Sequence, residues 1–537
     1  MKKTMLLAAA VIAALALPAQ GRDRRSDEVT LAVFSLNDFH GAFVRNDYKD
    51  IPGAAAVWQT LDSLKRVYPH NLTVSGGDIF GGSYFYNATH GTLLPTFFNG
   101  LGIRLSALGN HEFDDGQAAL ARRWRDVKPY PASWDISFVC ANVRDSSGSV
   151  PAFAQPYAQE QVEIGGKTVR VGFVGLIASS TPQQASKSKL VGLTFDGNYP
   201  AVLDSVKRLA GYNEAIGKAN VRILLTHIGT KMENGRPAWD DIDAAHLATI
   251  DDPAWDAIIS AHSHQPVSGT INARHYPIVQ GKWHGEYICI LKFHLDRRTL
   301  KVRRVESELC PVRGNVRLGP GPQRLQQQVD SLLRHTKTRG GTPLGERLTV
   351  APTTLVHDRD DKYRQTFVGT LVCRAYAEAY RRAAHLSPAD IIIGASHFGS
   401  IRAGFVKGPV SVLDVGETLP FANALRAYRL TGRQLTALVD FGFHNQRFGW
   451  LQTGWLKPTL DADRHVTALA YVGPDGISRP IGPDTPCILV ADEFIVNGGD
   501  GYAPAFFPAA QEVKADMPAT TDAFINYLKT FTTLPTE

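Results

Sequence analysis

The stretch TLAVFSLNDFHG, residues 30–41, joins an apolar run to a cluster of polar side chains. A nearly continuous apolar run is typical of a strand that is covered on both faces, as in a layered α/β sheet. Asn37, Asp38 and His40 follow at the point where this strand would end. The same order recurs along the chain, and both the fold and the site are predicted from it.

Apolar runs alternate with helix-like or loop segments through the first 300 residues. This alternation predicts a layered α/β domain with helices on the outside. The predicted strands are Thr30–Leu36, Leu72–Ser75, Ser137–Ala141, Val169–Ile177, Val221–Thr226, Ala257–Ser260, Tyr276–Val279 and Tyr287–His294.

Polar side chains gather where these strands end. Ligands in open α/β sheets bind at the carboxyl ends of strands. Five of the 17 histidines lie there in glycine-flanked loops, beside short carboxylates and one amide: the residues are Asp38, His40, Asp78, Asn110, His111, His227, His262 and His264. Taken singly, each fragment also fits a turn, a helix cap or a solvated surface. Their coincidence at strand ends favours one shared site.

The chemistry of these residues indicates metal binding. Imidazole, carboxylate and amide oxygen suit Zn²⁺, Mn²⁺ or similar cations. The candidates are too many for one tetrahedral ion and fit two ions that share a bridging carboxylate. A structural thiolate zinc site is not expected, because no cysteine accompanies the cluster. The five cysteines are scattered and odd in number, so they cannot all pair within the chain.

Length and charge set broad limits. A chain of 537 residues is too long for one compact core, so two or more domains are expected. Apolar residues make up 44% and charged residues 20%, as in an ordinary globular protein. The net charge of +6 is small for this length and gives no reason to expect a nucleic-acid polymer as partner. The sequence does not indicate an oligomeric state.

The first 21 residues have the order of a secretory signal peptide. Lys2 and Lys3 precede the apolar run Met5–Leu17, and Pro18 and small residues follow. The run is too short for a comfortable transmembrane anchor. No cysteine precedes Cys140, so no N-terminal lipid-anchored cysteine is expected. We therefore predict export, to the periplasm or the exterior, without a stable membrane anchor.

A break near residue 340 divides the chain. Leu325–Lys337 is a helix-prone polar stretch, and Arg339–Pro343 ends it with two glycines and a proline. We predict a first domain over 28–310, a connector with a helix over 311–344 and a second domain over 345–537. The second domain is expected to hold a helix at Phe367–His385, a strand at Ile391–Ile393 and a glycine-rich loop at Asn497–Gly501.

The polar motifs resemble those of a known family. They read Asn37-Asp38-Phe39-His40-Gly41, Gly77-Asp78, Gly109-Asn110-His111-Glu112, His227 and His262-Ser263-His264. This ordered set is similar to that of calcineurin-like metallophosphoesterases, and the layout of the whole chain resembles the secreted 5′-nucleotidase family. The resemblance implies a four-layered domain, a β-sandwich flanked by helices, followed by a second α/β domain that binds nucleotide.

The resemblance also implies roles for the residues. Asp38, His40 and His264 would hold one divalent ion. Asn110, His227 and His262 would hold the other, with Asp78 as the bridge. His111 would lie near the phosphate without binding metal, and Asp114 would orient it. Two ions can hold a bridging hydroxide that attacks phosphorus directly, so no covalent phosphoenzyme is expected. His111 would stabilise developing charge or protonate the leaving oxygen, and both roles stay open.

In the second domain the resemblance implies a nucleotide site. Its motifs are Gly399-Ser400-Ile401-Arg402, Leu419-Pro420-Phe421-Ala422-Asn423 and Asn497-Gly498-Gly499-Asp500-Gly501-Tyr502. Phe421 and Phe494 would sandwich a base, although both also fit a core role. Arg402, with Arg364 or Lys362, would meet polar or anionic groups, and Asp500 would accept from the sugar hydroxyls. Asn423 belongs to the same candidate site.

Two positions depart from the family pattern. His397 stands where the family usually has asparagine, and an apolar residue near Phe367 replaces another asparagine. A histidine at 397 could still hydrogen-bond the base, but it is bulkier and can carry charge. Both departures bear on the identity of the substrate and leave the metal residues untouched.

The predicted function is that of a phosphohydrolase acting on 5′-nucleotides or related nucleoside phosphates. Two alternatives within the enzyme class are a 2′,3′-cyclic-nucleotide phosphodiesterase and a UDP-sugar pyrophosphatase. Relatives that hydrolyse sulfur-linked thioesters are a further one, against which the nucleotide motifs argue. From another class, the chain could be an inactive nucleotide-binding protein.

Overall fold

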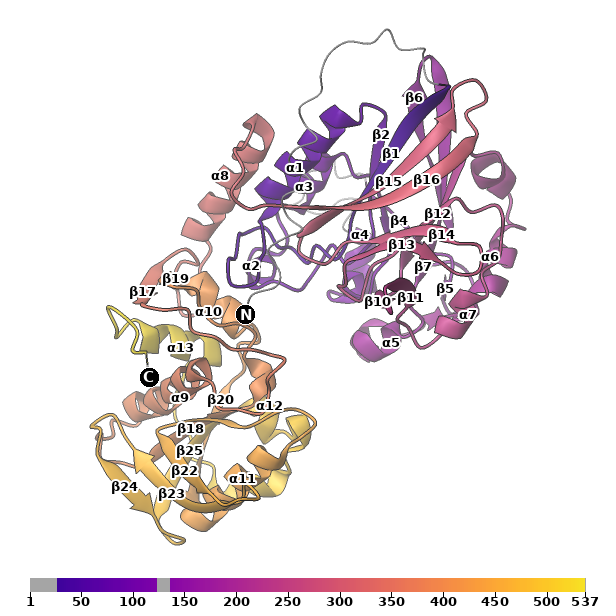
Figure 1. Ribbon diagram of the computed structural model, residues 1–537. Helices are drawn as coiled ribbons and strands as arrows, with labels where there is room; N and C mark the ends of the chain where they lie inside the picture. The colour runs from indigo at the N-terminus through magenta and orange to yellow at the C-terminus, as the bar shows by residue number, and fades with distance from the viewer. Residues whose placement is uncertain (1–26, 123–135, 537) are drawn as a thin grey trace.

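The computed structural model describes residues 27–122 and 136–536. The predicted signal peptide, residues 1–21, lies outside these described residues. Within them, no helix combines the length and apolar character needed to cross a bilayer. Strands β1 to β16 lie in one lobe and β17 to β25 in another (Figure 1).

Two six-stranded sheets form the first lobe. The first has the order β16-β15-β1-β2-β3-β4, with β1 to β4 parallel and β15 and β16 antiparallel to their neighbours. Its strands are β1 (Glu28–Leu36), β2 (Asn71–Ser75), β3 (Leu105–Ala107), β4 (Ser137–Val139), β15 (Tyr287–Asp296) and β16 (Val302–Pro311).

The second sheet has the order β13-β14-β12-β9-β7-β6. Its strands are β6 (Tyr157–Ile164), β7 (Lys167–Ile177), β9 (Val221–His227), β12 (Ala257–Ile259), β13 (Val267–Ile271) and β14 (Tyr276–Gln280). Two short pairs lie outside the sheets, β5 (Val143–Arg144) with β8 (Thr194–Phe195), and β10 (Thr230–Glu233) with β11 (Arg236–Trp239).

Strand β1 shows why its residues are apolar on both faces. Leu31 and Val33 pack into a core between the two sheets, whereas Ala32 and Phe34 pack on the outer face of the first sheet. Successive side chains of a strand point to opposite faces, so a strand in the middle of such layers needs apolar residues at every position. All eight strands predicted in the first domain are confirmed.

Helices cover the outer faces of both sheets. On the first sheet, α1 (Ala54–Val67) and α3 (Leu94–Leu101) share its outer core, and on the second, α6 (Tyr199–Val206) and α7 (Ala244–Ala248) do so. Short helices α2 (Tyr84–Thr89), α4 (Gln117–Arg122) and α5 (Thr181–Gln184) complete the lobe. The layers are therefore helix, sheet, sheet and helix, which confirms the predicted fold class.

The second lobe is built on a four-stranded sheet with the order β20-β25-β18-β21. In β18, Ile392 packs on the face shared with α9, and Ile393 packs on the face shared with α11. The strands are β20 (Leu425–Thr431), β25 (Pro486–Asp492), β18 (Ile392–Ser396) and β21 (Gln452–Gly454), and the helices are α9 (Phe367–Ala383), α10 (Val412–Thr418), α11 (Gly432–His444), α12 (Glu493–Val496) and α13 (Thr520–Leu528).

Smaller sheets flank the second lobe. β17 (Arg347–Ala351) pairs with β19 (Gly408–Ser411), and β22 (Leu456–Leu460), β23 (Val466–Val472) and β24 (Ser478–Ile481) form an antiparallel sheet. The predicted helix at Phe367–His385 and strand at Ile391–Ile393 are confirmed as α9 and β18. The loop predicted at Asn497–Gly501 contains a 3₁₀ turn, Gly499–Gly501.

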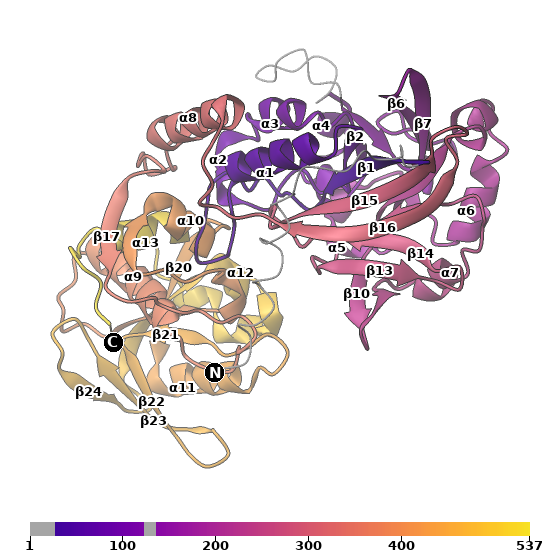
Figure 2. The ribbon, with the colours of Figure 1, turned by 45° about the horizontal axis from the view of Figure 1, so that its top comes forward.

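The lobes meet through the connector helix α8 (Pro320–His335) and a polar contact. Helix α8 lies beside α1 and α3 in both views (Figures 1 and 2). Glu417, on α10, accepts from Lys49 Nζ at 2.8 Å and from the backbone N–H of Tyr84 at 2.8 Å. These contacts tie the second lobe to the loops that carry the candidate site of the first.

Candidate metal centre and substrate site

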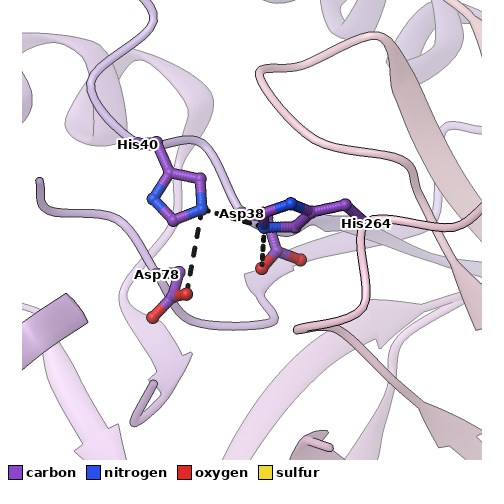
Figure 3. Close-up of side chains that lie close together, drawn as sticks. All are labelled: Asp38, His40, Asp78 and His264. Atoms are coloured by element: carbon purple, nitrogen blue, oxygen red, sulfur yellow. Dashed lines mark hydrogen bonds and ion pairs between the residues drawn. The ribbon is translucent and has the colours of Figure 1, made fainter. Parts of the chain in front are cut away.

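Loops after three strands bring four predicted metal residues together. One ligand atom from each of Asp38, His40, Asp78 and His264 lies within 4.8 Å of the others (Figure 3). His40 Nε2 lies 3.1 Å from His264 Nε2 and 3.8 Å from Asp78 Oδ2, and His264 Nε2 lies 3.4 Å from Asp38 Oδ1. Two imidazole nitrogens and two carboxylates thus converge on one point.

A second group shares Asp78 with the first. Asp78, His227 and His262 also place their ligand atoms within 4.8 Å of one another. His227 Nε2 lies 3.2 Å from Asp78 Oδ2 and 3.3 Å from His262 Nδ1. His227 Nδ1 lies 2.8 Å from the carbonyl oxygen of Gly76 and must donate to it, which leaves Nε2 to face the carboxylate.

The charges of the cluster suit a cation. Burial alone would raise the pKa of the Asp78 carboxyl, but His227 and the other nearby imidazoles hold it well below its usual range. Burial lowers the pKa of His40 to about 3 and that of His262 to about 4, which leaves both rings neutral with lone pairs to give. For His227, the Asp78 charge outweighs burial and raises the pKa to about 10. Without a metal ion, a proton balances part of this negative charge, and metal binding would displace it.

The loops that carry these residues have an unusual backbone. Five of the candidate ligands adopt left-handed φ angles: Asp38 (49°), His40 (50°), Asp78 (51°), His262 (81°) and His264 (56°). Such angles are uncommon for residues with a side chain, and they cluster at functional sites. Gly81, at φ +68°, passes so close to His111 and Asp114 that a Cβ there would collide with them.

His111 and Asp114 form a pair at the edge of the cluster. His111 Nδ1 lies 2.8 Å from Asp114 Oδ2, and its ring centroid is 4.8 Å from that of His40. Burial lowers the pKa of His111, but the hydrogen bond to Asp114 and the Asp78 charge raise it to about 9. Because Nδ1 is bonded to Asp114 and the side chain is 36% exposed, Nε2 is the ring nitrogen that is free to meet a substrate.

Asn110 precedes this pair and has an open acceptor. Its side-chain Oδ1 is buried and has no hydrogen-bond partner. Buried polar atoms are nearly always paired in native proteins, so this lone buried oxygen indicates a missing partner.

Two residues inside the motifs were given no role from sequence. The Glu112 carboxylate accepts from the backbone N–H groups of Gly109 (2.6 Å), Ile79 (2.7 Å), Asp78 (3.0 Å) and Phe80 (3.4 Å). It therefore fixes the loop that presents Asp78. Asn37 donates to Asp38 Oδ2 at 2.6 Å and so orients that carboxylate. Their place in the motifs was the only signal of these roles.

Trp283 is a third residue that the sequence did not single out. Its ring stacks on His264 with centroids 4.7 Å apart, and on His284 with centroids 4.2 Å apart. The stack fixes the plane of the most exposed histidine of the cluster. An aromatic residue in the loop after β14 carries no pattern that would reveal this contact.

The second-domain candidates form a group of their own. His397 Nδ1 lies 2.7 Å from Asp500 Oδ2, and its ring stacks on Phe494 at 4.6 Å. Phe494 is 42% exposed and Phe421 is 52% exposed, which does not fit a core role for either. One oxygen of Asp500 is thus already bonded to His397, the position that departs from the family pattern.

The remaining candidates surround this group. The Arg402 guanidinium lies 5.0 Å from the Phe421 ring centroid, its Nε is buried without a partner, and burial lowers its pKa to about 10. Arg364 is exposed and pairs with Asp361 at 3.2 Å. Asn423 is half-buried, and Phe367 begins α9 and packs against the core. Among the described residues, none of these candidates hydrogen-bonds to the first-domain cluster.

Comparison with known proteins agrees with this geometry. Residues 32–266 match the family model for calcineurin-like phosphoesterases, and residues 347–507 match that for the 5′-nucleotidase C-terminal domain. The chain combines a calcineurin-like phosphoesterase domain with a 5′-nucleotidase C-terminal domain. It is therefore a phosphomonoester hydrolase, which confirms the resemblance and the enzyme class predicted from sequence.

Two relatives and one solved structure are similar over most of the chain. An apyrase of Tabanus yao is 24% identical over 90% of this chain and 88% of its own length. A 5′-nucleotidase of Bos taurus is 22% identical over 88% and 84%. The crystal structure of a 5′-nucleotidase precursor from Thermus thermophilus has a TM-score of 0.60 and 22% identity, and it covers 94% of this chain and 97% of that chain. This similarity confirms the fold.

The calcineurin-like phosphoesterase fold implies divalent metal ions, and the residues present fit them. The donors are nitrogen and oxygen atoms only, the set that Zn²⁺ or Mn²⁺ accepts. Two imidazole pairs approach within 3.1 and 3.3 Å, a contact that a shared cation would stabilise. The buried Asn110 oxygen also lacks a partner.

Proposed function

We propose that this chain is an exported phosphohydrolase that uses two divalent ions to release phosphate from 5′-nucleotides or related nucleoside phosphates. One observation carries the proposal: two ligand groups share Asp78 and lie beside a histidine–aspartate pair. One ion would take Asp38, His40 and His264, and the other Asn110, His227 and His262, with Asp78 between them. Zn²⁺ and Mn²⁺ are the candidates for both.

Residues of the chain would have separate roles in the reaction. When bound, two divalent ions neutralise phosphate oxygens and make water a better nucleophile. With its pKa raised to about 9, His111 would carry protons on both ring nitrogens, donate from Nδ1 to Asp114 and present the Nε2 proton to the phosphate. There it would stabilise developing charge or protonate the leaving oxygen. Glu112 and Asn37 would keep Asp78 and Asp38 in place during turnover.

The second domain, residues 345–537, would select the substrate, while residues 28–310 perform the chemistry and 311–344 connect the two. Phe421 and Phe494 are exposed aromatic residues suited to stacking on a base. Arg402, Arg364 and Asn423 would meet polar groups of the nucleotide. His397 and Asp500 already bond to each other, so we infer that they act on the sugar or base as a pair.

Export is part of the proposal. It rests on the order of charged, apolar and small residues over 1–21. Fractionation of the producing cells, with an antibody to the mature chain, tests it. Recovery of full-length protein in the cytoplasm would refute it.

A substrate panel tests the activity. AMP, ADP, UDP-glucose, 2′,3′-cyclic AMP and p-nitrophenyl phosphate are compared with Mn²⁺, Zn²⁺ or EDTA present. We expect metal-dependent release of phosphate, fastest from AMP. Faster turnover of the cyclic compound or of UDP-glucose would favour the phosphodiesterase or pyrophosphatase alternative. No turnover of any compound with either metal would favour a nucleotide-binding protein instead.

A further inference from the structure

A cavity of about 340 Å³ lies in the second domain away from the candidate substrate residues. Its lining includes residues of α9, β21, β22 and β23. Strands β22 and β23 lie at the end of the second lobe remote from the first (Figure 1). None of the second-domain residues proposed to bind substrate lines this cavity. Its volume falls within the range of small-molecule sites, about 300–1,000 Å³.

Two hydrogen-bond donors on its wall have no partner. Arg374 Nε and Trp455 Nε1 are both buried and unpaired. Because buried donors without an acceptor are rare in native proteins, both mark the wall of this cavity as a place that lacks an acceptor. Both atoms only donate hydrogen bonds, so the missing partner must be a hydrogen-bond acceptor such as an oxygen.

The wall is aromatic and cationic. Trp450, Trp455 and Phe443 supply flat surfaces, and the Arg374 guanidinium lies 4.3 Å from the Trp455 ring centroid. Lys457 stands on the rim and is exposed. No carboxylate occurs among the described residues that line the cavity. Flat rings favour a planar ligand, and two cations without a counter-charge favour an anionic one.

The backbone at Trp455 is also strained. Its φ angle is +64°, a left-handed conformation that a bulky residue adopts only where the surroundings impose it. The carbonyl of Trp455 accepts from the N–H of Val472 at 3.0 Å, which holds this conformation between β21 and β22. Strain of this kind is concentrated at ligand-binding sites.

From these features we propose that the cavity is a second binding site for a planar anionic ligand of the nucleoside monophosphate class. The ring would lie against the tryptophans. The phosphate would accept from Arg374 and pair with Lys457. This site is separate from the substrate site and does not depend on the hydrolysis proposed above.

The cavity is connected to the segment that carries Arg364. The Gln365 side chain lines the cavity and exchanges two hydrogen bonds with the backbone of Thr453, at 3.0 and 3.1 Å. The Gln452 side chain donates to the carbonyl of Arg364 at 2.8 Å. Hydrogen bonds of two neighbouring side-chain amides thus join the cavity wall to the backbone of Arg364.

Equilibrium dialysis of labelled AMP against the whole mature chain in EDTA tests the site without turnover. We expect two equivalents of AMP per chain. The double variant Phe421→Ala, Phe494→Ala should keep one equivalent. Adding Arg374→Gln should weaken that remaining equivalent by about tenfold or more, the effect of one charge-assisted hydrogen bond. Arg382→Gln, an exposed arginine on the same helix, is the matched control and should change nothing.

Lys457→Glu keeps the test valid if Arg374→Gln impairs folding, because Lys457 is exposed and its replacement leaves the packing intact. It should also weaken the second equivalent. Photolabelling with 8-azido-AMP should modify the segment 450–457 in the Phe421, Phe494 double variant. A single equivalent in the wild-type chain, or a second one that neither Arg374→Gln nor Lys457→Glu weakens, would overturn the proposal.

Discussion

Replacing Glu112 by glutamine should destabilise the first domain strongly. Glu112 is 2% exposed, and each carboxylate oxygen accepts from two backbone N–H groups. Glutamine has one oxygen and one NH₂ group, so one pair of N–H donors would face another donor. Burial and the Asp78 charge raise the pKa of Glu112 to about 7, so the comparison is made above that pH, where the carboxylate is charged. Hydrogen bonds to charged groups contribute about 1.5–3 kcal/mol each, so the loss of two costs about 3 kcal/mol or more.

Thermal unfolding measures this loss. In EDTA, where metal cannot mask the effect, about 3 kcal/mol corresponds to a fall in Tm of about 6–12 °C for a domain of this size. Glu233→Gln is the control, because Glu233 is exposed and pairs only weakly with Lys231 at 3.9 Å. Its free energy of unfolding should change by less than about 0.5 kcal/mol.

The metal content of Glu112→Gln gives a second readout. Since Glu112 holds the N–H groups of Asp78 and Ile79, the variant should also bind metal more weakly. A Tm equal to that of Glu233→Gln, together with normal metal content, would refute the role assigned to Glu112.

Three further predictions concern the site itself. His111→Ala should lower kcat by about 10²–10⁴-fold, the contribution of a proton-transferring side chain, with metal content unchanged by elemental analysis; loss of metal would mean that His111 is a ligand. Phe421→Ala and Phe494→Ala should each raise KM for AMP by about tenfold, because stacking on a base contributes about 1–3 kcal/mol, and should leave p-nitrophenyl phosphate turnover nearly unchanged. Equal losses on both substrates would assign the two rings a structural role. Trp283→Ala should weaken metal binding by about 10–100-fold, as do other losses of a residue that orients a ligand, and Trp283→Phe should restore it by stacking again on His264; normal binding in the alanine variant would contradict this.

Most strands predicted from sequence lie in the middle of their sheets. The exceptions are β4, a predicted strand at an edge, and β3, a middle strand of three residues that is too short to form a recognisable apolar run. Thr30–Leu36 and Val169–Ile177 are recognisable because burial on both faces requires continuous apolar residues. The edge strands β6 (YAQEQVEI) and β16 (VRRVESELCP) were not predicted. They are partly exposed and carry charged residues along their length, which removes the apolar run on which the prediction depends.

The candidate site was predictable for a related reason. Parallel strands end at one edge, so residues that follow them meet there wherever they lie in the chain. The contacts of Glu112 and Trp283 were not predictable, because they depend on the positions of backbone N–H groups and on a loop that arrives from elsewhere. The bond between His397 and Asp500 is similar: each was proposed to meet substrate, and the structure joins them to each other.

The left-handed backbone of five candidate ligands limits the stability that this domain can reach while it keeps its activity. The five are Asp38, His40, Asp78, His262 and His264. Each such residue costs about 1 kcal/mol relative to glycine, so the five together cost about 5 kcal/mol. That is comparable with the whole free energy of unfolding of a small domain, about 5–15 kcal/mol. Glycine at His40, His262 or His264 would therefore give a more stable protein without a metal centre. At Asp38 and Asp78 it would instead leave the N–H groups of His262 and His111 without their acceptors. Stabilising variants found by selection for heat resistance alone should accumulate at the three histidines, and selection for turnover should remove them.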